Sequence, residues 1–354
     1  MEFLIDYGSF LLKTISLIVI ISIPFLIFFS SKGKDASASG TLKITNLSDK
    51  LDNMAGAVKS LTLNKNERKK LQKEKKKNLK AKKNKSIPKP VFVLNFNGDI
   101  EASSVENLKE EITAILKSET KCQELVLKLE SPGGTVIGYG LCAAQLQRLR
   151  DAGIKVTACV DKVAASGGYM MACVCNKIVS SPFAIIGSIG VVAAIPNFHK
   201  VLKKNNVDYE LHTAGEYKRT ITMFGETTPA GRKKFKEHLE DIHVLFKDHI
   251  KKFRPSLDMK KIATGETWEG IKALEVGLVD EISTSDEYLL NLSKKHEIFE
   301  ISFITKQKFQ DKLSRYSSLV EISSTKPTSK ALIPSHVSPV AIFFIFNEGL
   351  NFLM

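Results

Sequence analysis

Residues 124–172 read ELVLKLESPGGTVIGYGLCAAQLQRLRDAGIKVTACVDKVAASGGYMMA and alternate between strand and helix patterns. Residues 125–129 and 155–160 are short apolar runs, which favour buried strands. Residues 139–151 carry apolar side chains at helical spacing, and residues 164–168 open a second helical stretch. Strands that alternate with helices at this pitch form a mainly parallel sheet with crossover helices. The sequence therefore predicts an α/β fold.

The same alternation continues on both sides of this stretch. Upstream, residues 91–96 (VFVLNF) predict a strand and residues 108–116 a helix. Downstream, residues 178–198 contain no charged side chain, but prolines and glycines divide them into short pieces that favour buried strands and turns. Residues 209–213 are expected to form another strand.

A long amphipathic helix follows. Thr228 is a favourable N-cap and Pro229 a favourable first helical residue, whereas Arg254-Pro255 ends the helix. Its predicted apolar face consists of Phe235, Leu239, Ile242, Phe246, Ile250 and Phe253.

The net charge of +14 is concentrated in one segment. Residues 64–85 hold twelve Lys or Arg and two Glu, a net charge of +10, which leaves about +4 for the rest of the chain. This distribution excludes the broad basic surface of a nucleic-acid-binding domain. The segment predicts a solvated helix or tether, and the prolines in residues 86–90 end it.

The first thirty residues have the pattern of a membrane span. No charged residue interrupts residues 14–29, and residues 10–12 extend the apolar stretch to about 20 residues, enough to cross a bilayer. A cleaved signal peptide is the alternative, because Ala36-Ser37-Ala38 is similar to a cleavage site. Glu2 and Asp6 make the preceding region acidic rather than basic, so the sequence favours an uncleaved anchor.

The predicted organisation has four parts. Residues 1–30 form the anchor, residues 31–90 a heptad-like and Lys-rich linker, residues 91–305 one α/β domain, and residues 306–354 a Ser/Thr/Lys-rich tail. In the linker, apolar residues recur at steps of four and three between Leu47 and Leu61, which predicts a helix that packs on the body or associates weakly with another copy.

The tail and the cysteines carry weaker signals. Residues 340–346 are apolar but too short to span a bilayer. The cysteines are odd in number and show no CxxC spacing, which favours buried thiols over a disulfide framework or a zinc site. They are Cys122, Cys142, Cys159, Cys173 and Cys175.

Three elements of the sequence are candidates for chemistry. Ser166 lies among small residues between a strand and a helix, a context that suits a nucleophile or a simple capping serine. Gly133-Gly134 follows a strand and either presents backbone N–H groups to an oxyanion or forms only a tight turn. The seven histidines show no catalytic motif. Lys218 can replace a histidine as the base if desolvation keeps its amine neutral.

Four motifs occur in order: ESPGG at residues 130–134, DKVAASGGYMMA at 161–172, GSIGV at 187–191 and AGEYKRT at 214–220. Together with WEGIKALEVGLVDEI at 268–282, they resemble the signal peptide peptidase (SppA-like) family of serine proteases and are most similar to its SohB branch of inner-membrane proteases. The resemblance covers essentially the whole chain, including the anchor and the basic tether.

This resemblance implies a ClpP/crotonase-like α/β spiral core that cleaves peptides through a Ser–Lys dyad, without a cofactor or metal. The family's nucleophile falls on Ser166 and its general base on Lys218. Its oxyanion glycine falls on Gly133, and the serine that orients the lysine falls on Ser188. The chain departs from the family pattern at residues 223–225 (MFG), which bears on substrate fit rather than on the chemistry. The family also forms ring-like homo-oligomers.

The implied mechanism depends on a neutral lysine. Lys218 takes the proton of Ser166 as the hydroxyl attacks the scissile carbonyl, and later activates the water that hydrolyses the acyl-enzyme. Because an exposed lysine is protonated at neutral pH, residues 178–198 are expected to supply an apolar wall beside the dyad.

Two other functions remain open from the sequence. A crotonase-fold acyl-CoA enzyme shares the glycine-rich turn but needs neither the Ser166–Lys218 pair nor the anchor. A non-catalytic membrane scaffold would work through residues 41–85. The expected partners are a peptide or protein substrate, membrane lipid beside the basic tether, and further copies of the chain, but no nucleic acid.

The side of the membrane also remains open. Lys32, Lys34 and Lys43 lie close behind the span, and the positive-inside rule then favours a cytoplasmic body. Better-known members of the wider family act on the envelope side.

Overall fold

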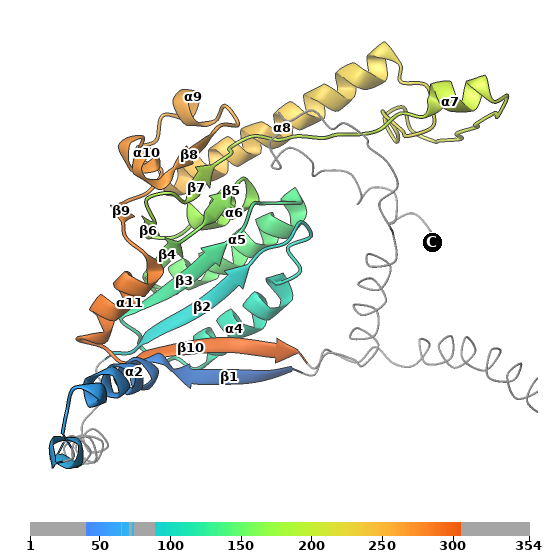
Figure 1. Cartoon of the computed structure of the whole chain (residues 1–354). Helices are drawn as coiled ribbons and strands as arrows, with labels where there is room; N and C mark the ends of the chain where they lie inside the picture. The colour runs from blue at the N-terminus through green and yellow to red at the C-terminus, as the bar shows by residue number, and fades with distance from the viewer. Residues whose placement is uncertain (1–39, 65, 71–72, 74–88, 306–354) are drawn as a thin grey trace, which may run out of the picture.

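The computed structural model of the chain describes residues 40–64, 66–70, 73 and 89–305. They form a mixed α/β fold built on a seven-stranded sheet with the order β1-β10-β2-β3-β4-β6-β9 (Figure 1). β1 is antiparallel to β10, and the other neighbouring strands are parallel. The strands are β1 Gly40–Asn46, β2 Val91–Asn97, β3 Glu124–Glu130, β4 Val156–Val160, β6 Lys177–Ser180, β9 Glu281–Ile282 and β10 Ile298–Thr305.

A smaller sheet lies beyond the end of β3. It has the order β5-β7-β8, with β5 parallel to β7 and β8 antiparallel to β7. A bridge between Ser131 and Ala164 connects its first strand to the residue that follows β3. Its strands are β5 Val163–Ala165, β7 Ile185–Gly187 and β8 Thr267–Glu269.

Helices cover both faces of the main sheet because its strands alternate their side chains between the faces. Phe92, Leu94 and Phe96 of β2 belong to the large core that also contains the buried side chains of α4, α5 and α6. Val91 and Val93 point to the other face, where Leu289 of α11 closes a smaller cluster. The helices are α2 Leu47–Leu61, α4 Val105–Lys117, α5 Val136–Asp151, α6 Gly167–Ala172, α7 His199–Lys204, α8 Pro229–Phe253, α9 Met259–Ile262, α10 Gly270–Glu275 and α11 Ser285–Ser293.

Most of the predicted elements of residues 91–305 are confirmed. The strands expected near residues 91–96, 125–129 and 155–160 are β2, β3 and β4, and the helix expected from Thr228 is α8. The Thr228 hydroxyl accepts a hydrogen bond from the Gly231 N–H at 3.0 Å, as an N-cap should.

Two elements differ from the sequence prediction. The strand expected at residues 209–213 is wrong: these residues have no regular secondary structure and their side chains are exposed. The segment has strand-like alternation but pairs with no other strand in the described chain, so the pattern alone does not form a ladder. β1 was not expected, because its pairing partner β10 lies about 260 residues away along the chain.

Residues 191–228 form an arm that extends along α8, away from the sheets (Figure 1). Only the first part of the uncharged stretch, through β6 and β7, is buried as expected, whereas its last residues belong to this arm. The arm leaves eight large apolar side chains exposed: Val192, Phe198, Val201, Val207, Tyr209, Leu211, Tyr217 and Phe224. Exposed apolar clusters of this kind mark interaction surfaces.

Several sequence predictions concern residues outside this description. The anchor at residues 1–30 and the tail at residues 306–354 both lie there. Among the residues that are described, no helix is long and apolar enough to cross a bilayer. The cysteine prediction is confirmed for four thiols, which are free and buried, whereas Cys122 is half-buried.

α4 carries a buried carboxylate that makes stability depend on pH. Glu111 is 5% exposed, and its Oε1 accepts a hydrogen bond from the Phe303 N–H of β10 at 2.7 Å. Burial raises the pKa of Glu111 to about 7 against the effect of that hydrogen bond, and the charge of Glu300 adds to the increase.

Glu111→Gln is expected to raise the free energy of unfolding at about pH 8 and to change it little at about pH 4. The unfolded chain ionises this glutamate near pH 4.5, whereas the folded chain keeps it protonated up to about 7. The wild type therefore loses stability, on the order of 3 kcal/mol, as the pH rises through this interval. Glutamine avoids that loss because its amide oxygen still accepts the Phe303 N–H.

Urea unfolding of the full chain, followed by the fluorescence of its single tryptophan, Trp268, measures this difference. Glu110→Gln is the matched control, because Glu110 is the exposed neighbour on the same helix. Equal effects of the two substitutions at both pH values would contradict the assignment.

Candidate active site

Ser166 occupies a strained turn between β5 and α6. Its φ of 51° and ψ of −116° are uncommon for a residue with a side chain, and such strain costs on the order of 1–3 kcal/mol. Two hydrogen bonds hold it: the Ser166 N–H donates to the Gly187 carbonyl at 2.7 Å, and the Ser166 carbonyl accepts from the Met170 N–H at 2.9 Å. A turn of this kind lifts the hydroxyl out of the sheet at the N-terminus of a helix, where it can meet a substrate.

The glycine turn after β3 lies directly against Ser166. The Ser131 N–H donates to the Val163 carbonyl at 2.9 Å, and the Ala165 N–H donates to the Ser131 carbonyl at 3.0 Å, so the turn runs beside β5. Gly133 has a φ of +94°, and a Cβ there would lie 2.7 Å from the Cβ of Ser166. Glycine is required at this position for both its conformation and its close approach.

A buried chain of hydrogen bonds fixes this turn. The Gly133 N–H donates to Ser131 Oγ at 3.0 Å, and Ser131 Oγ lies 2.5 Å from Tyr139 Oη. Tyr139 Oη donates to the Asp99 carbonyl at 2.7 Å, so the Ser131 hydroxyl must donate to the tyrosine oxygen. Burial raises the pKa of Tyr139 to about 12, which keeps the phenol protonated as this chain requires. Neither Ser131 nor Tyr139 was singled out from the sequence, because no local pattern pairs them.

Gly134 and Gly167 place backbone N–H groups beside Ser166. Both glycines line a small apolar hollow of about 10 Å³ beside Ser166, together with Met170 and Phe246. Among the hydrogen bonds of the described residues, none uses the Gly134 or Gly167 N–H, whereas the Gly133 N–H is bound to Ser131. Free donors beside a nucleophile are suited to binding an oxyanion.

Ser188 and Ser166 follow neighbouring strands of the smaller sheet. Ala165 pairs with Gly187 in the parallel register of β5 and β7, so the residues that follow them, Ser166 and Ser188, leave the sheet side by side. Ser188 has a φ of 52°, and its N–H donates to the Glu266 carbonyl at 2.7 Å. The structure thus brings together three of the predicted site residues: Gly133, Ser166 and Ser188.

Lys218 lies elsewhere, on the exposed arm. Its neighbour Tyr217 packs against Lys234, whose Nζ is 5.3 Å from the centre of the tyrosine ring. Lys234 precedes Phe246, which lines the hollow at Ser166, by twelve residues of α8, about 18 Å along a helix. Within one chain, Lys218 is therefore not brought against Ser166.

The described histidines do not replace Lys218 as a base beside Ser166. Six of them are described, and none is hydrogen-bonded to Ser166 in this structure. His249 contacts α6, but through its Nε2, which lies 3.1 Å from the Met170 carbonyl oxygen, and burial lowers the pKa of His249. His212 is exposed on the arm beside Glu210.

Comparison with known proteins identifies the family of the chain. The model of peptidase family S49 matches residues 148–298, and the model of its N-terminal part matches residues 2–146. "Probable protease SohB" of Haemophilus influenzae is 45% identical over 327 residues, covering 89% of this chain and 93% of that protein. "Probable protease SohB" of Buchnera aphidicola subsp. Acyrthosiphon pisum is 48% identical over 315 residues, covering 89% and 94%.

A solved structure, the membrane-bound stomatin-specific protease 1510-N, matches 58% of this chain and 85% of its own with 14% identity and a TM-score of 0.38. Of the three functions that the sequence leaves open, serine-type peptidase is the one in keeping with the S49 models and both SohB relatives. The chain belongs to peptidase family S49, as an SppA-like serine peptidase of the SohB branch.

Proposed function

We propose that the chain is a membrane-anchored endopeptidase in which Ser166 of one copy and Lys218 of a neighbouring copy form the catalytic dyad. The observation that carries this proposal is the separation of the two residues. Ser166 lies at a strained, glycine-lined turn, whereas Lys218 follows Tyr217, which contacts Lys234 in the N-terminal half of α8. Its substrates are peptides or fragments of membrane and envelope proteins, and its core is a ClpP/crotonase-like spiral.

The surfaces of the arm and of α8 support assembly between copies. Of the predicted apolar face of α8, only Phe246 and Ile250 are buried, whereas Phe235, Leu239 and Ile242 toward the arm are partly exposed. Together with the exposed apolar side chains of the arm, they are apolar groups that a second copy can cover. A closed ring of identical copies repeats one such contact and brings each arm to the next copy's hollow.

Assembly also supplies the environment that the base needs. A lysine surrounded by water is protonated at neutral pH and cannot accept a proton. Burying Lys218 between two copies disfavours its charged form, and Ser188, beside Ser166, can hold the neutral amine without the negative charge of a carboxylate.

Each step of the reaction then has a residue to perform it. The neutral Lys218 amine takes the proton from Ser166 Oγ while the oxygen bonds to the scissile carbonyl carbon. The ammonium gives that proton to the leaving amine as the C–N bond breaks, which leaves an acyl-enzyme. Lys218 then takes a proton from water, the hydroxide displaces Ser166, and the serine recovers its proton.

The glycine turn stabilises the charge that develops on the carbonyl oxygen. The N–H groups of Gly134 and Gly167 beside Ser166 are the donors available in the described structure. The Gly133 N–H can join them if the oxyanion replaces Ser131 Oγ as its acceptor. Losing one such donor typically lowers the rate by about 10²–10³.

Membrane attachment completes the proposal. Residues 1–30 anchor the chain, the basic part of the linker of residues 31–90 lies near anionic lipid, and residues 91–305 form the peptidase domain. β1 and α2 also lie within residues 31–90, yet they pack on the main sheet, so the tether is confined to the basic part. The basic residues behind the span favour a cytoplasmic peptidase domain.

A fluorophosphonate probe is expected to label the full chain at Ser166, because an activated serine oxygen displaces fluoride from phosphorus. The adduct is located by mass spectrometry of the peptides. Ser166→Ala should remove the adduct, whereas Ser256→Ala, at an exposed serine outside the site, should leave the labelling rate unchanged. An adduct on another residue, or none in the wild type, would refute Ser166 as the nucleophile.

A further inference from the structure

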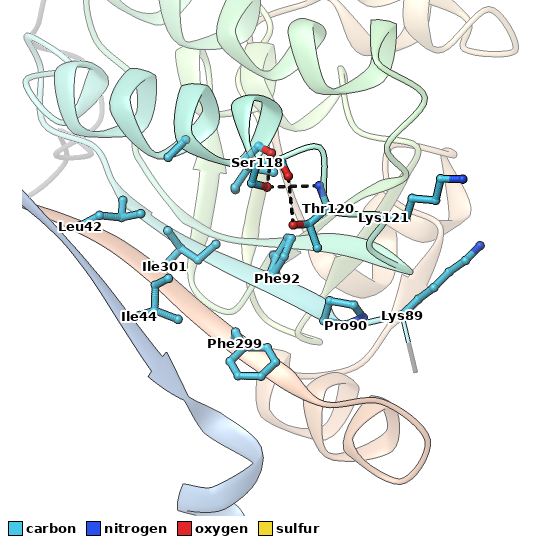
Figure 2. A pocket seen from close by; sticks show the side chains of 12 residues that line it. Leu42, Ile44, Lys89, Pro90, Phe92, Ser118, Thr120, Lys121, Phe299 and Ile301 are labelled. Atoms are coloured by element: carbon cyan, nitrogen blue, oxygen red, sulfur yellow. Dashed lines mark hydrogen bonds between the residues drawn. The ribbon is translucent and has the colours of Figure 1, made fainter. Parts of the chain in front are cut away.

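A second hollow, larger than that at Ser166, lies at the β1 edge of the main sheet. It has a volume of about 550 Å³ and lies between β1, β10 and the C-terminal end of α4 (Figure 2). Its lining shares no residue with the hollow at Ser166. We propose that this groove binds an acyl chain of an anionic phospholipid from the membrane in which the chain is anchored.

Apolar side chains form the walls of the groove. They are left open because α4 covers β2 and β10 but ends before it shields β1. Ile44 of β1 pairs with Ile301 of β10, and both line the groove with Leu42, Phe92, Ile115 and Phe299. Ile44 is 61% exposed and Leu42 40% exposed, although both point into this hollow. A concave apolar groove with a volume of about 550 Å³ and exposed aliphatic walls is suited to a flexible apolar ligand.

One end of the groove is basic. Lys89 and Lys121 line that end, close to the hydroxyl side chains of Ser118 and Thr120, whereas Leu42 lies at the other end (Figure 2). Neither lysine forms an ion pair with the part of the chain that the structure describes. Two lysines and two hydroxyl side chains at one end of an apolar groove complement a lipid tail that carries a phosphate headgroup.

The position of the groove in the chain favours a membrane lipid as the occupant. β1 begins ten residues after the proposed anchor, and ten extended residues span at most about 35 Å. The basic segment of residues 64–85 ends just before Lys89 in the sequence. Lys89 lines the basic end of the groove, so this end is connected to a tether that is expected to lie near anionic lipid. The proposal therefore rests on the proposed membrane anchoring and is independent of the peptidase chemistry.

The chain's own apolar residues 340–346 are the rival occupant, because β10 leads into the tail. They offer no acidic side chain to the two lysines. Charge complementarity thus favours the lipid over the tail.

Photocrosslinking of the full chain in nanodiscs tests the proposal. The probe is phosphatidylglycerol with a diazirine near the end of one acyl chain, and phosphatidylcholine with the same acyl chain is the neutral comparison. We expect crosslinks to peptides of β1, β10 and α4 in addition to the anchor. Ile44→Gln should lower groove labelling about fivefold, because it places an amide in the apolar wall. Lys89→Gln with Lys121→Gln should lower phosphatidylglycerol labelling about tenfold and phosphatidylcholine labelling little.

Two matched controls separate these effects from general ones. Ile304→Gln changes an exposed isoleucine on the other face of β10, and Lys117→Gln an exposed lysine of α4, and both should label as the wild type does. Labelling of the anchor alone would overturn the groove proposal while leaving the anchoring intact. Groove labelling that appears only after residues 306–354 are deleted would overturn it in favour of the tail, and failure of the chain to insert would overturn both.

Discussion

Mixing Ser166→Ala chains with Lys218→Ala chains should restore peptidase activity that neither variant has alone. Each substitution removes one half of the proposed dyad, and each should lower kcat/KM by at least about 10⁴, since the two residues act as one unit. In a mixed assembly, however, the intact Ser166 of one chain meets the intact Lys218 of another. Random mixing in equal amounts recreates about one quarter of the sites, so about one quarter of the wild-type activity should return.

The design distinguishes a shared site from one that closes within a chain. If the arm folded back so that Lys218 met Ser166 of its own chain, every chain in the mixture would lack one partner and no activity would return. Co-expression of two differently tagged variants, with both tags recovered in one complex, ensures that mixed assemblies are measured. Lys204→Ala is the matched control, because Lys204 is another exposed lysine of the arm and is expected to leave activity unchanged.

An absence of recovered activity in verified mixed complexes would exclude the shared dyad. A monomer in solution by light scattering, with full activity, would exclude it as well. Retained hydrolysis in either single variant would contradict the dyad itself, whether it is shared or not.

Much of the fold is predictable because local patterns dominate it. Residues 91–96, 125–129 and 155–160 are short apolar runs between turn residues, and each is a buried strand of the main sheet. The N-cap at Thr228 is equally local. β1 escaped prediction because its strand character depends on a distant partner, β10, and the strand expected at residues 209–213 has no partner in the described chain.

The site is less accessible to sequence reasoning because its residues meet through the register of two strands. Ala165 and Gly187 pair, and that register brings Ser188 beside Ser166, which spacing along the chain does not indicate. The motifs identified Ser166 and Gly133 through a resemblance, whereas the link from Gly133 through Ser131 to Tyr139 follows only from the packing. Lys218 lies on an exposed arm, and its proposed contact with Ser166 of another copy depends on assembly, for which a single sequence carries no direct signal.

Gly133→Ala should lower kcat/KM by about 10² or more while the chain remains folded. The added Cβ would lie 2.7 Å from the Cβ of Ser166, 2.8 Å from the Ala165 carbonyl oxygen and 2.8 Å from the Gly167 nitrogen. Contacts this short force the turn and the nucleophile apart, which displaces the backbone donors from the position of the oxyanion. Because donor geometry counts only once charge develops, kcat should fall much more than KM rises.

Gly153→Ala provides the matched control. Gly153 also has a positive φ, +75°, but a Cβ there meets nothing within 4 Å. Both substitutions incur the backbone strain of an alanine in this conformation, about 1 kcal/mol, and Gly133→Ala should lower the melting temperature further because its Cβ also collides with neighbouring backbone. Only Gly133→Ala adds the collision with Ser166, so the ratio of the two kcat values isolates the effect of the site. If Gly133→Ala kept the activity of Gly153→Ala, the close approach of this turn to Ser166 would have no part in catalysis.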